Sequence, residues 1–256
     1  MAVKLKSESE MRIMREAGQI VGQTLAALRE KVKPGVDVLE LEAFVDDEYE
    51  RRGVGSPFLD YSPAPKYPPY PSRICISVND ELVHGIPKHR LLKEGDIVSM
   101  DLGSVWKGYV GDAAITVGVG KVSAQAQDLI DVTSQALAAG IEAAGKAKHL
   151  SDICAAIEDA ILPSGYSIVR GYGGHGVGRS MHEAPHIPNH RIRFKGIPIR
   201  TGLVIALEPM VIVGGPETYE CEDGWTVKTV DGSLCCHFEH TIAIREGQPP
   251  EVLTLP

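Results

Sequence analysis

The sequence lacks the long apolar runs that membrane-spanning and exported chains carry. No stretch approaches the roughly eighteen apolar residues of a transmembrane helix. Lys4 and Lys6 near the N-terminus are not followed by the apolar segment of a signal peptide. We therefore expect a protein that has no signal peptide and does not span a membrane.

Cysteine is too scarce and too irregularly placed for a disulfide framework. The chain has five cysteines, an odd number that includes the adjacent pair Cys235 and Cys236. Their spacing also does not match a zinc ribbon. This cysteine usage predicts a reducing, cytoplasmic location.

Blocks of basic residues are missing as well. The net charge is −8, which argues against nucleic acid or an anionic membrane as the main partner. What remains is an ordinary globular composition, with 43% apolar residues. A length of 256 residues allows one large domain or two small ones.

Two aspartates flank a predicted tight turn. If strands Ile97–Val105 and Tyr109–Val117 pair around a centre between Trp106 and Lys107, Asp101 lies opposite Asp112. Like charges at such positions repel, and the first strand is otherwise largely apolar. A divalent cation between the two carboxylates would relieve this repulsion, because hard cations bind carboxylate oxygens.

The Asp101–Asp112 pair by itself leaves two other interpretations open. Both side chains can belong to a solvated surface hairpin, which needs no cation. A bulge of one residue would place the two carboxylates on opposite faces of the sheet. The metal hypothesis therefore depends on further ligands elsewhere in the chain.

The chain contains what reads as an internal duplication. Residues 95–101 and 202–208 both run from a glycine through mostly apolar residues to a carboxylate, Asp101 or Glu208. Each follows two stretches with the 3.6-residue apolar period of a helix. The four stretches are Glu8–Lys31, a helix from Val38 to Gly53, Ala124–Ala144, and a helix from Leu150 to Gly165.

The duplication predicts an α+β fold in which one curved antiparallel sheet is covered by four helices. Residues 1–256 would then form a single domain with two pseudo-symmetric halves, about 8–120 and 121–245. Asp101 and Glu208 would be symmetry partners that approach one centre. Chance similarity is the alternative.

A glycine-rich segment in the second half carries a candidate histidine. Residues 171–176 match G-x-G-x-x-G, but no strand–helix unit follows and Pro185 and Pro188 would break such a helix. We therefore reject dinucleotide binding. The glycines instead let the backbone place His175 in a crowded site. Histidine is both a frequent metal ligand and a frequent acid–base group, although a lone buried histidine is more often structural.

One more carboxylate completes the candidate set. Glu239 lies in a predicted strand, where a single exposed glutamate would be the ordinary interpretation. Together with Asp101, Asp112, His175 and Glu208 it gives four carboxylates and one imidazole. This oxygen-rich set suits paired Mn²⁺, Fe²⁺ or Co²⁺ ions better than a structural zinc.

The chain resembles the methionine aminopeptidases, in particular the compact bacterial type I enzymes. The resemblance covers nearly the whole chain, and its motifs occur in the order of that family. The motifs are His84-Gly-Ile-Pro87, the Asp101–Asp112 hairpin, Gly174-His-Gly-Val-Gly178, His182-Glu-Ala-Pro185, Ile205-Ala-Leu-Glu-Pro-Met210 and Glu239-His-Thr241.

The resemblance implies a pita-bread fold and two divalent metal ions, Mn, Fe or Co. The implied ligands are Asp101, Asp112, His175, Glu208 and Glu239. Asp112 and Glu239 would be the ligands shared most closely, and Glu208 would also shuttle protons. His182 would stabilise the oxygen of the tetrahedral intermediate, and His84 would contact the substrate amide near the leaving group.

The resemblance also implies a reaction and a substrate. Two metal ions bridging one water would lower its pKa, so that hydroxide attacks the carbonyl after the N-terminal methionine. The free substrate amine would bind one metal. The implied methionine pocket contains Tyr67, Tyr70, Cys75, Met181 and Trp225, next to His84 and His182. A flexible thioether suits such an aromatic and sulfur-lined slot, although core packing would explain the same residues.

The implied role is removal of the initiator methionine from nascent polypeptides whose second residue is small. No residue argues for a membrane or for a nucleic acid partner. Transient ribosome association would suit such an enzyme, although no residue argues for it, and a monomer is the default expectation.

Several positions depart from the resemblance. Val83 and Met181 replace a cysteine and a bulkier aromatic residue, and the loop from Tyr61 to Pro71 is longer than in the shortest relatives. Residues 235–237 read Cys-Cys-His where Ser-Ala-Gln is usual. His237 lies two residues before Glu239, so in one strand both face the same side. His237 can then reach the metal site, although we expect His237 and Cys235 simply to pack.

Three other functions are alternatives to this one. A proline-specific peptidase of the same fold would carry a large N-terminal domain, and only a short segment precedes Met11. A type II methionine enzyme needs a helical insert between His182 and Glu208, and only 25 residues separate them. A metal-free binding module should have lost ligands, yet all five are present.

Overall fold

Four α-helices form where the apolar periodicity predicts them in the computed structural model, which describes residues 2–256. They are α1 (Glu8–Lys31), α2 (Val38–Arg52), α3 (Ala124–Ala144) and α4 (Leu150–Ile161), which is followed by the short 3₁₀ turn η1 (Leu162–Ser164). None of the helices between residues 2 and 256 has the length and apolar character of a membrane span.

Local side-chain chemistry explains where these helices begin and end. Ser7 precedes α1 and accepts a hydrogen bond from the backbone N–H of Glu10, whose carboxylate in turn accepts the N–H of Ser7. Gly53 ends α2 with a left-handed φ of 64°, a conformation that favours glycine. Pro163 tightens the chain after α4 into η1, which ends at the left-handed Gly165.

The strands are mostly short, apart from one long central hairpin. They are β1 (Ile74–Val78), β2 (Glu81–Val83), β3 (Ile97–Trp106), β4 (Tyr109–Gly118), β5 (Ser167–Ile168), β6 (Gly173–Gly176), β7 (Glu183–Pro188), β8 (Val204–Leu207), β9 (Met210–Ile212), β10 (Thr218–Glu220), β11 (Val227–Thr229), β12 (Cys235–His237), β13 (Glu239–Ala243) and β14 (Glu251–Val252).

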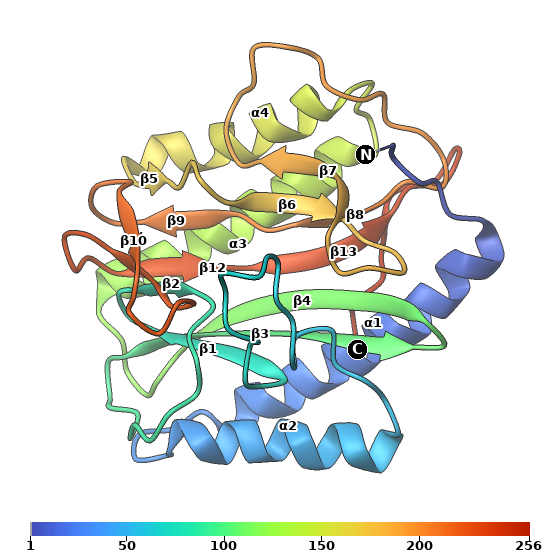
Figure 1. Ribbon diagram of the computed structural model, residues 1–256. Coiled ribbons are helices and arrows are strands. Elements are labelled where there is room, and N and C mark those ends of the chain that lie inside the picture. The colour runs from blue at the N-terminus through green and yellow to red at the C-terminus, as the bar shows by residue number, and fades with distance from the viewer. Residues whose placement is uncertain (1) are drawn as a thin grey trace.

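The main sheet is antiparallel and joins strands from both ends of the chain. Its order is β1-β3-β4-β13-β8-β6-β7, with β14 paired to β13. Two small sheets, β10-β11-β2 and β12-β9-β5, adjoin it. Figure 1 shows the curl of the main sheet, with α1 and α2 along β1, β3 and β4, and α3 and α4 along the strands of the second half. The predicted curved antiparallel sheet with four helices is confirmed.

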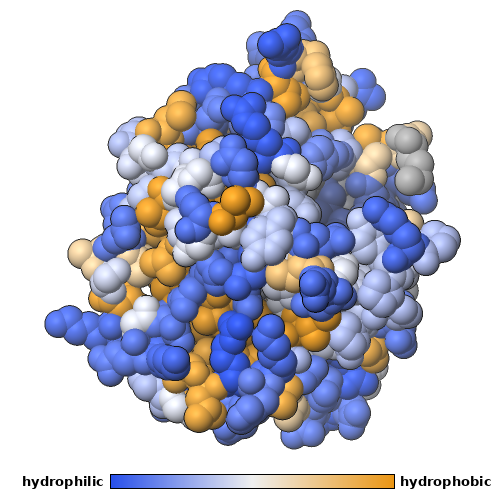
Figure 2. Space-filling model, turned by 60° about the vertical axis from the view of Figure 1, so that its left-hand side comes forward, coloured by the Kyte–Doolittle hydropathy of each residue, from blue (hydrophilic) through white to orange (hydrophobic). Residues whose placement is uncertain are grey.

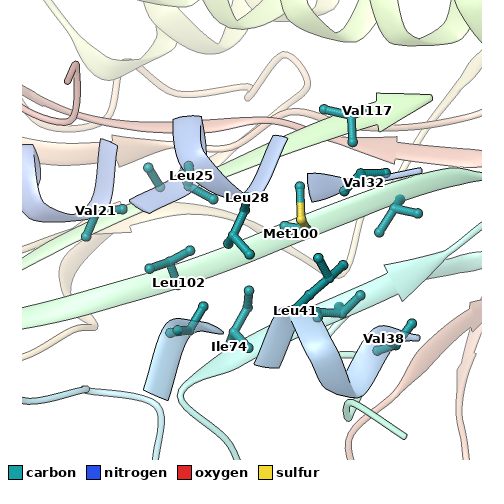
Figure 3. Close-up of a cluster of buried hydrophobic side chains, with 14 of the residues drawn as sticks. Val21, Leu25, Leu28, Val32, Val38, Leu41, Ile74, Met100, Leu102 and Val117 are labelled. Carbon is teal, nitrogen blue, oxygen red and sulfur yellow. The ribbon is translucent and has the colours of Figure 1, made fainter. Parts of the chain in front are cut away.

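Apolar side chains from the helices and strands fill the space between them. In Figure 3, Met100 and Leu102 of β3 lie between side chains of α1, such as Leu28, and of α2, such as Leu41. A second core packs α3 and α4 against β7, β8, β9, β12 and β13. Burying one such side chain contributes about 1.5–3 kcal/mol, so these cores hold the sheet in its curled shape.

The surface gives no sign of one large apolar face on the side shown in Figure 2. That side is mostly hydrophilic, and its hydrophobic residues lie in several separate groups. Scattered exposed apolar residues of this kind are normal in folded proteins.

The β3–β4 hairpin differs from its predicted register. Lys107 and Gly108 both have positive φ, 49° and 77°, and form a two-residue turn closed by the pairing of the residues on either side. The centre therefore lies between Lys107 and Gly108, so that Asp101 pairs with Ala114 rather than with Asp112. The predicted opposition of Asp101 and Asp112 is wrong. Because the ladder has no bulge and the offset is two residues, both aspartates still share a face.

Helix α1 approaches the sheet so closely that side chains are excluded at the contact. A Cβ atom on Gly111 of β4 would lie 2.6 Å from the backbone nitrogen of Gly18 in α1. A Cβ atom on Gly18 would overlap the carbonyl oxygen of Leu253. Gly111 directly precedes Asp112, so this backbone contact fixes the strand that carries a candidate ligand.

The close approach of Gly18 to the carbonyl oxygen of Leu253 predicts that Gly18→Ala destabilises the protein. Helix propensity alone would stabilise it by about 1 kcal/mol, whereas overpacking a filled space costs about 1–3 kcal/mol. We expect a lower free energy of unfolding in urea denaturation. Gly171→Ala is the control, because nothing lies within 4 Å of its added Cβ. A Gly18→Ala protein more stable than the parent would contradict the close contact.

Candidate metal centre

The five predicted ligands come from five neighbouring strand positions of the main sheet. Asp101 is on β3, Asp112 on β4, Glu239 at the start of β13, Glu208 directly after β8, and His175 on β6. In the sheet these strands follow one another in the order β3-β4-β13-β8-β6. The sheet order therefore brings residues that lie far apart in the chain, such as Asp112 and His175, which are 63 positions apart, to one place.

Strand register places these side chains on one face. Ala114 of β4 pairs with Asp101 on one side and with Glu239 on the other. Paired residues of adjacent strands point to the same face, and so does Asp112, two residues from Ala114. The small side chain of Ala114 leaves the space between the carboxylates open.

The ligand atoms lie at the separations expected for a shared cation. His175 Nε2 is 3.8 Å from Asp112 Oδ2, 3.7 Å from Glu208 Oε1 and 3.8 Å from Glu239 Oε1. Asp112, His175 and Glu239 form one group whose ligand atoms lie within 4.8 Å of one another. Asp101, His237 and Glu239 form a second group of the same kind. Glu239 belongs to both groups, which therefore share one carboxylate.

Several buried carboxylate oxygens of the cluster lack a hydrogen-bond partner, which is the arrangement expected of cation ligands. Asp101 Oδ1, Asp112 Oδ1 and Glu239 Oε1 are buried and have no hydrogen-bond partner. Leaving a buried polar group unpaired costs about 1–3 kcal/mol, and more for a charged group. Within residues 2–256 the ion pairs of this cluster involve only histidines, not lysine or arginine. A divalent ion would satisfy these oxygens.

The surroundings strongly perturb the titration of the cluster. Burial raises the pKa of Asp112 to about 7. Burial and repulsion from neighbouring carboxylates raise the pKa values of Asp101, Glu208 and Glu239 well above their usual range. Burial also lowers the pKa of His175 to about 3, which keeps its imidazole neutral. A neutral imidazole is the form that binds a metal.

Close backbone packing orients His175. A Cβ on Gly174 would overlap the carbonyl oxygen of Ala206, and one on Gly176 would overlap that of Ala184. Only glycine therefore fits on either side of the histidine. His175 Nδ1 donates to the carbonyl oxygen of Gly176 at 3.1 Å, which leaves Nε2 free to face the carboxylates.

A cavity of about 370 Å³ opens next to the carboxylates. All seven predicted pocket residues line it: Tyr67, Tyr70, Cys75, His84, Met181, His182 and Trp225. Phe58 and Tyr61 also line it, and no motif in the sequence indicated them. The aromatic rings contact one another, as in the edge-on packing of Tyr70 against Trp225 at 5.2 Å between centroids.

The two other predicted histidines approach the centre from the cavity side. The ring of His182 lies 4.4 Å from that of His175, and its Nδ1 is 3.0 Å from the hydroxyl of Tyr61. His84 has a positive φ of 59°, a rare backbone conformation that recurs at functional sites. Burial, together with the nearby His182, lowers the pKa of His84 to about 4.

His237 departs from its predicted packing role. It does not share a strand with Glu239, because β12 ends at His237 and β13 begins after Phe238. His237 is 1% exposed, and its Nε2 lies 3.6 Å from Glu208 Oε2. Cys235 does pack, with its thiol donating to the carbonyl oxygen of Asn79. No signal in the sequence distinguishes these two residues.

Two supporting residues were not found from the sequence. Thr241 Oγ1 donates to the carbonyl oxygen of Asp112 at 2.7 Å and accepts from its N–H at 3.2 Å. Asn189 is fully buried and donates to the carbonyl oxygen of Glu208 at 2.9 Å. Both hold the backbone of candidate ligands, and such contacts depend on tertiary neighbours.

Fold and site together define a metal-dependent hydrolase class, in which a curled antiparallel sheet presents a carboxylate-rich centre. The chain belongs to metallopeptidase family M24, whose model matches residues 12–246. It is 47% identical to a methionine aminopeptidase of Aquifex aeolicus over 252 residues, which cover 97% of this chain and 98% of that relative.

Solved structures agree with this assignment. The methionine aminopeptidase of Thermotoga maritima matches with a TM-score of 0.94 at 38% identity, covering 100% of both chains. Prolidase from Pyrococcus furiosus matches with a TM-score of 0.78 at 21% identity, covering 98% of this chain and 65% of that one, and shows the fold alone. The predicted pita-bread fold is confirmed.

The raised carboxylate pKa values predict that the metal-free protein loses stability as the pH rises. Between the unfolded pKa of about 4 and the higher folded values, the native state holds more protons than the unfolded state. Stability from this source therefore declines through that interval. The buried histidines, with lowered pKa values, act in the opposite direction only below about pH 6.5.

The test is thermal unfolding in excess chelator from about pH 7.5 to 8.5, where at least about nine-tenths of each histidine is neutral in both states. The midpoint should fall with pH in the parent protein and fall less steeply in Asp112→Asn. Saturating metal should abolish the decline. An equal slope in both metal-free proteins would show that Asp112 is not the source.

Proposed function

We propose that this protein hydrolyses the N-terminal methionine from polypeptides whose second residue is small. The observation that most directly supports this proposal is that the carboxylate–imidazole centre and an aromatic, sulfur-lined pocket share one cavity. The membership in family M24 and the similarity to methionine aminopeptidases over the full chain support the proposal.

The chemistry of the pocket suits an unbranched thioether. Cys75 and Met181 place sulfur beside the rings of Tyr70 and Trp225. Methionine sulfur makes favourable contacts with aromatic rings of about 0.3–1.5 kcal/mol each. The indole N–H of Trp225 donates to the carbonyl oxygen of Pro68, so the pocket wall is held in place without using the ligand.

The centre would hold two divalent cations, of which Mn²⁺, Fe²⁺ and Co²⁺ suit the oxygen-rich donor set best. Asp101, Asp112, His175, Glu208 and Glu239 would bind them, with Glu239 shared between the two groups. When bound, such ions supply Lewis acidity and lower the pKa of a water molecule.

Three side chains of the cavity would handle the substrate and its protons. Glu208 faces the cavity and would accept a proton at its carboxylate and deliver it to the leaving amine. His182 would donate from Nε2 to the developing oxyanion while its Nδ1 contacts Tyr61. His84, which also lines the cavity, would contact the amide near the leaving nitrogen.

We also propose how the chain is organised and where it works. Residues 8–120 and 121–245 would be two halves of a single domain, because each supplies two helices and part of the main sheet. The substrates would be N-termini of nascent chains, met by a monomer in the cytoplasm with transient ribosome contact. The five free cysteines support a reducing compartment.

The substrate proposal predicts cleavage of Met-Gly-Met by the metal-loaded protein and no cleavage of Xaa-Pro dipeptides. Release of free methionine would be followed by chromatography. Asp112→Asn is the control and should lose nearly all turnover, because a buried ligand is replaced by a neutral amide. Cleavage of the Xaa-Pro substrate alone would overturn the proposal.

The role of His182 predicts a loss in kcat rather than in metal binding. His182→Ala should lower kcat by about 10²–10³, the usual effect of removing one oxyanion donor. Bound metal, measured by elemental analysis, should stay at the parent level. His190→Ala is the matched control, because His190 does not line the cavity. Equal losses of metal and turnover would make His182 a ligand instead.

A further inference from the structure

His237 is a buried imidazole whose outer nitrogen has no partner within the protein. The residue is 1% exposed, and Nε2 makes no hydrogen bond. An unpaired buried polar atom costs about 1–3 kcal/mol, so such an atom calls for a ligand or a functional explanation. Neither the five-ligand set nor the roles of His84 and His182 use it.

The surroundings of Nε2 are those of a metal ligand rather than of a hydrogen-bonding group. Its distance of 3.6 Å to Glu208 Oε2 is too long for a hydrogen bond. Two ligand atoms that each lie about 2.1 Å from one cation are separated by about 3–4 Å, depending on the angle between them. One ring nitrogen of His237 and one oxygen each of Asp101 and Glu239 form a group whose ligand atoms lie within 4.8 Å of one another.

This group mirrors the one around His175. Asp112, His175 and Glu239 form the first group, and Asp101, His237 and Glu239 form the second. Each contains one imidazole, and Glu239 is the member they share. The second group thus has a nitrogen donor of its own.

The backbone of His237 is held in place before any cation binds. Thr116 Oγ1 donates to the carbonyl oxygen of His237 at 2.6 Å and accepts from its N–H at 3.2 Å. Ser99 Oγ lies 2.7 Å from the same threonine oxygen. Support of this kind fixes a ligand's orientation and favours binding over rearrangement.

We propose that His237 is a sixth protein ligand, binding through Nε2 the cation that Asp101 and Glu239 hold. The inference rests on the proposed two-ion function. Each of the two cations then has one imidazole ligand. A nitrogen donor shifts the preference of the Asp101–Glu239 position away from Mn²⁺ and towards Co²⁺ and later metals of the series.

The direct test counts imidazoles in the cobalt-loaded parent protein. Two equivalents of Co²⁺ are bound to metal-free protein, the content is verified by elemental analysis, and X-ray absorption gives the average number of imidazoles per cobalt. One imidazole per cobalt supports the proposal. An average of one half, or failure to take up a second cobalt, overturns it.

Variants assign the second imidazole to its residue. In His237→Gln the average should fall from one to one half, and the affinity for the second Co²⁺, measured by calorimetry, should fall at least about tenfold. His240→Gln is the matched control. His240 is a histidine three residues away whose Nδ1 lies 2.8 Å from Thr254 Oγ1, and it belongs to neither group. An unchanged second affinity in His237→Gln overturns the proposal.

Peptidase assays separate the two proposals. If two cobalts bind with one imidazole each and Met-Gly-Met is not cleaved, the function fails and the ligand assignment stands. If the peptide is cleaved and the parent protein shows half an imidazole per cobalt, the assignment of His237 fails and the function stands.

Discussion

Repulsion among Asp101, Asp112, Glu208 and Glu239 is the force that the rest of the structure has to withstand. Four carboxylates meet where surrounding protein limits their hydration, and their pKa values rise as a result. No lysine or arginine among the described residues forms an ion pair with them. A cation therefore replaces protons as the stabilising partner, which makes the fold and the metal chemistry interdependent.

The scaffold resists this repulsion by placing the carboxylates on strands that already pair with one another. Ala114 lies between Asp101 and Glu239 in the ladder, and Thr241 ties β13 to the backbone of Asp112. Helix α1 packs backbone to backbone at Gly111 of β4. Because the main sheet is packed against helices, the carboxylates cannot separate without disrupting the cores. The cavity beside them then opens onto a centre of fixed geometry.

Much of the fold and of the site could be predicted because the signals are local. The helix bounds follow from capping residues and apolar periodicity, so α1 and α3 begin and end where predicted. Motifs that resemble those of a known family indicated the candidate ligands and the candidate pocket. The hairpin register was wrong because the turn type depends on the backbone at Lys107 and Gly108. The two-residue shift kept Asp101 and Asp112 on one face, so the error did not separate the two carboxylates.

Side chains supplied by distant neighbours could not be predicted in this way. Tyr61 and Phe58 reach the cavity, and Asn189 holds Glu208, only through the curl of the sheet. His237 faces Glu208 because the chain passes from β12 to β13 at Phe238. The sequence by itself determined the helices, the ligand types and the kind of chemistry, since residue order and composition encode them locally. Only the tertiary structure decided which groups lie close enough to share a cation, because that depends on how separate strands pair and curl together.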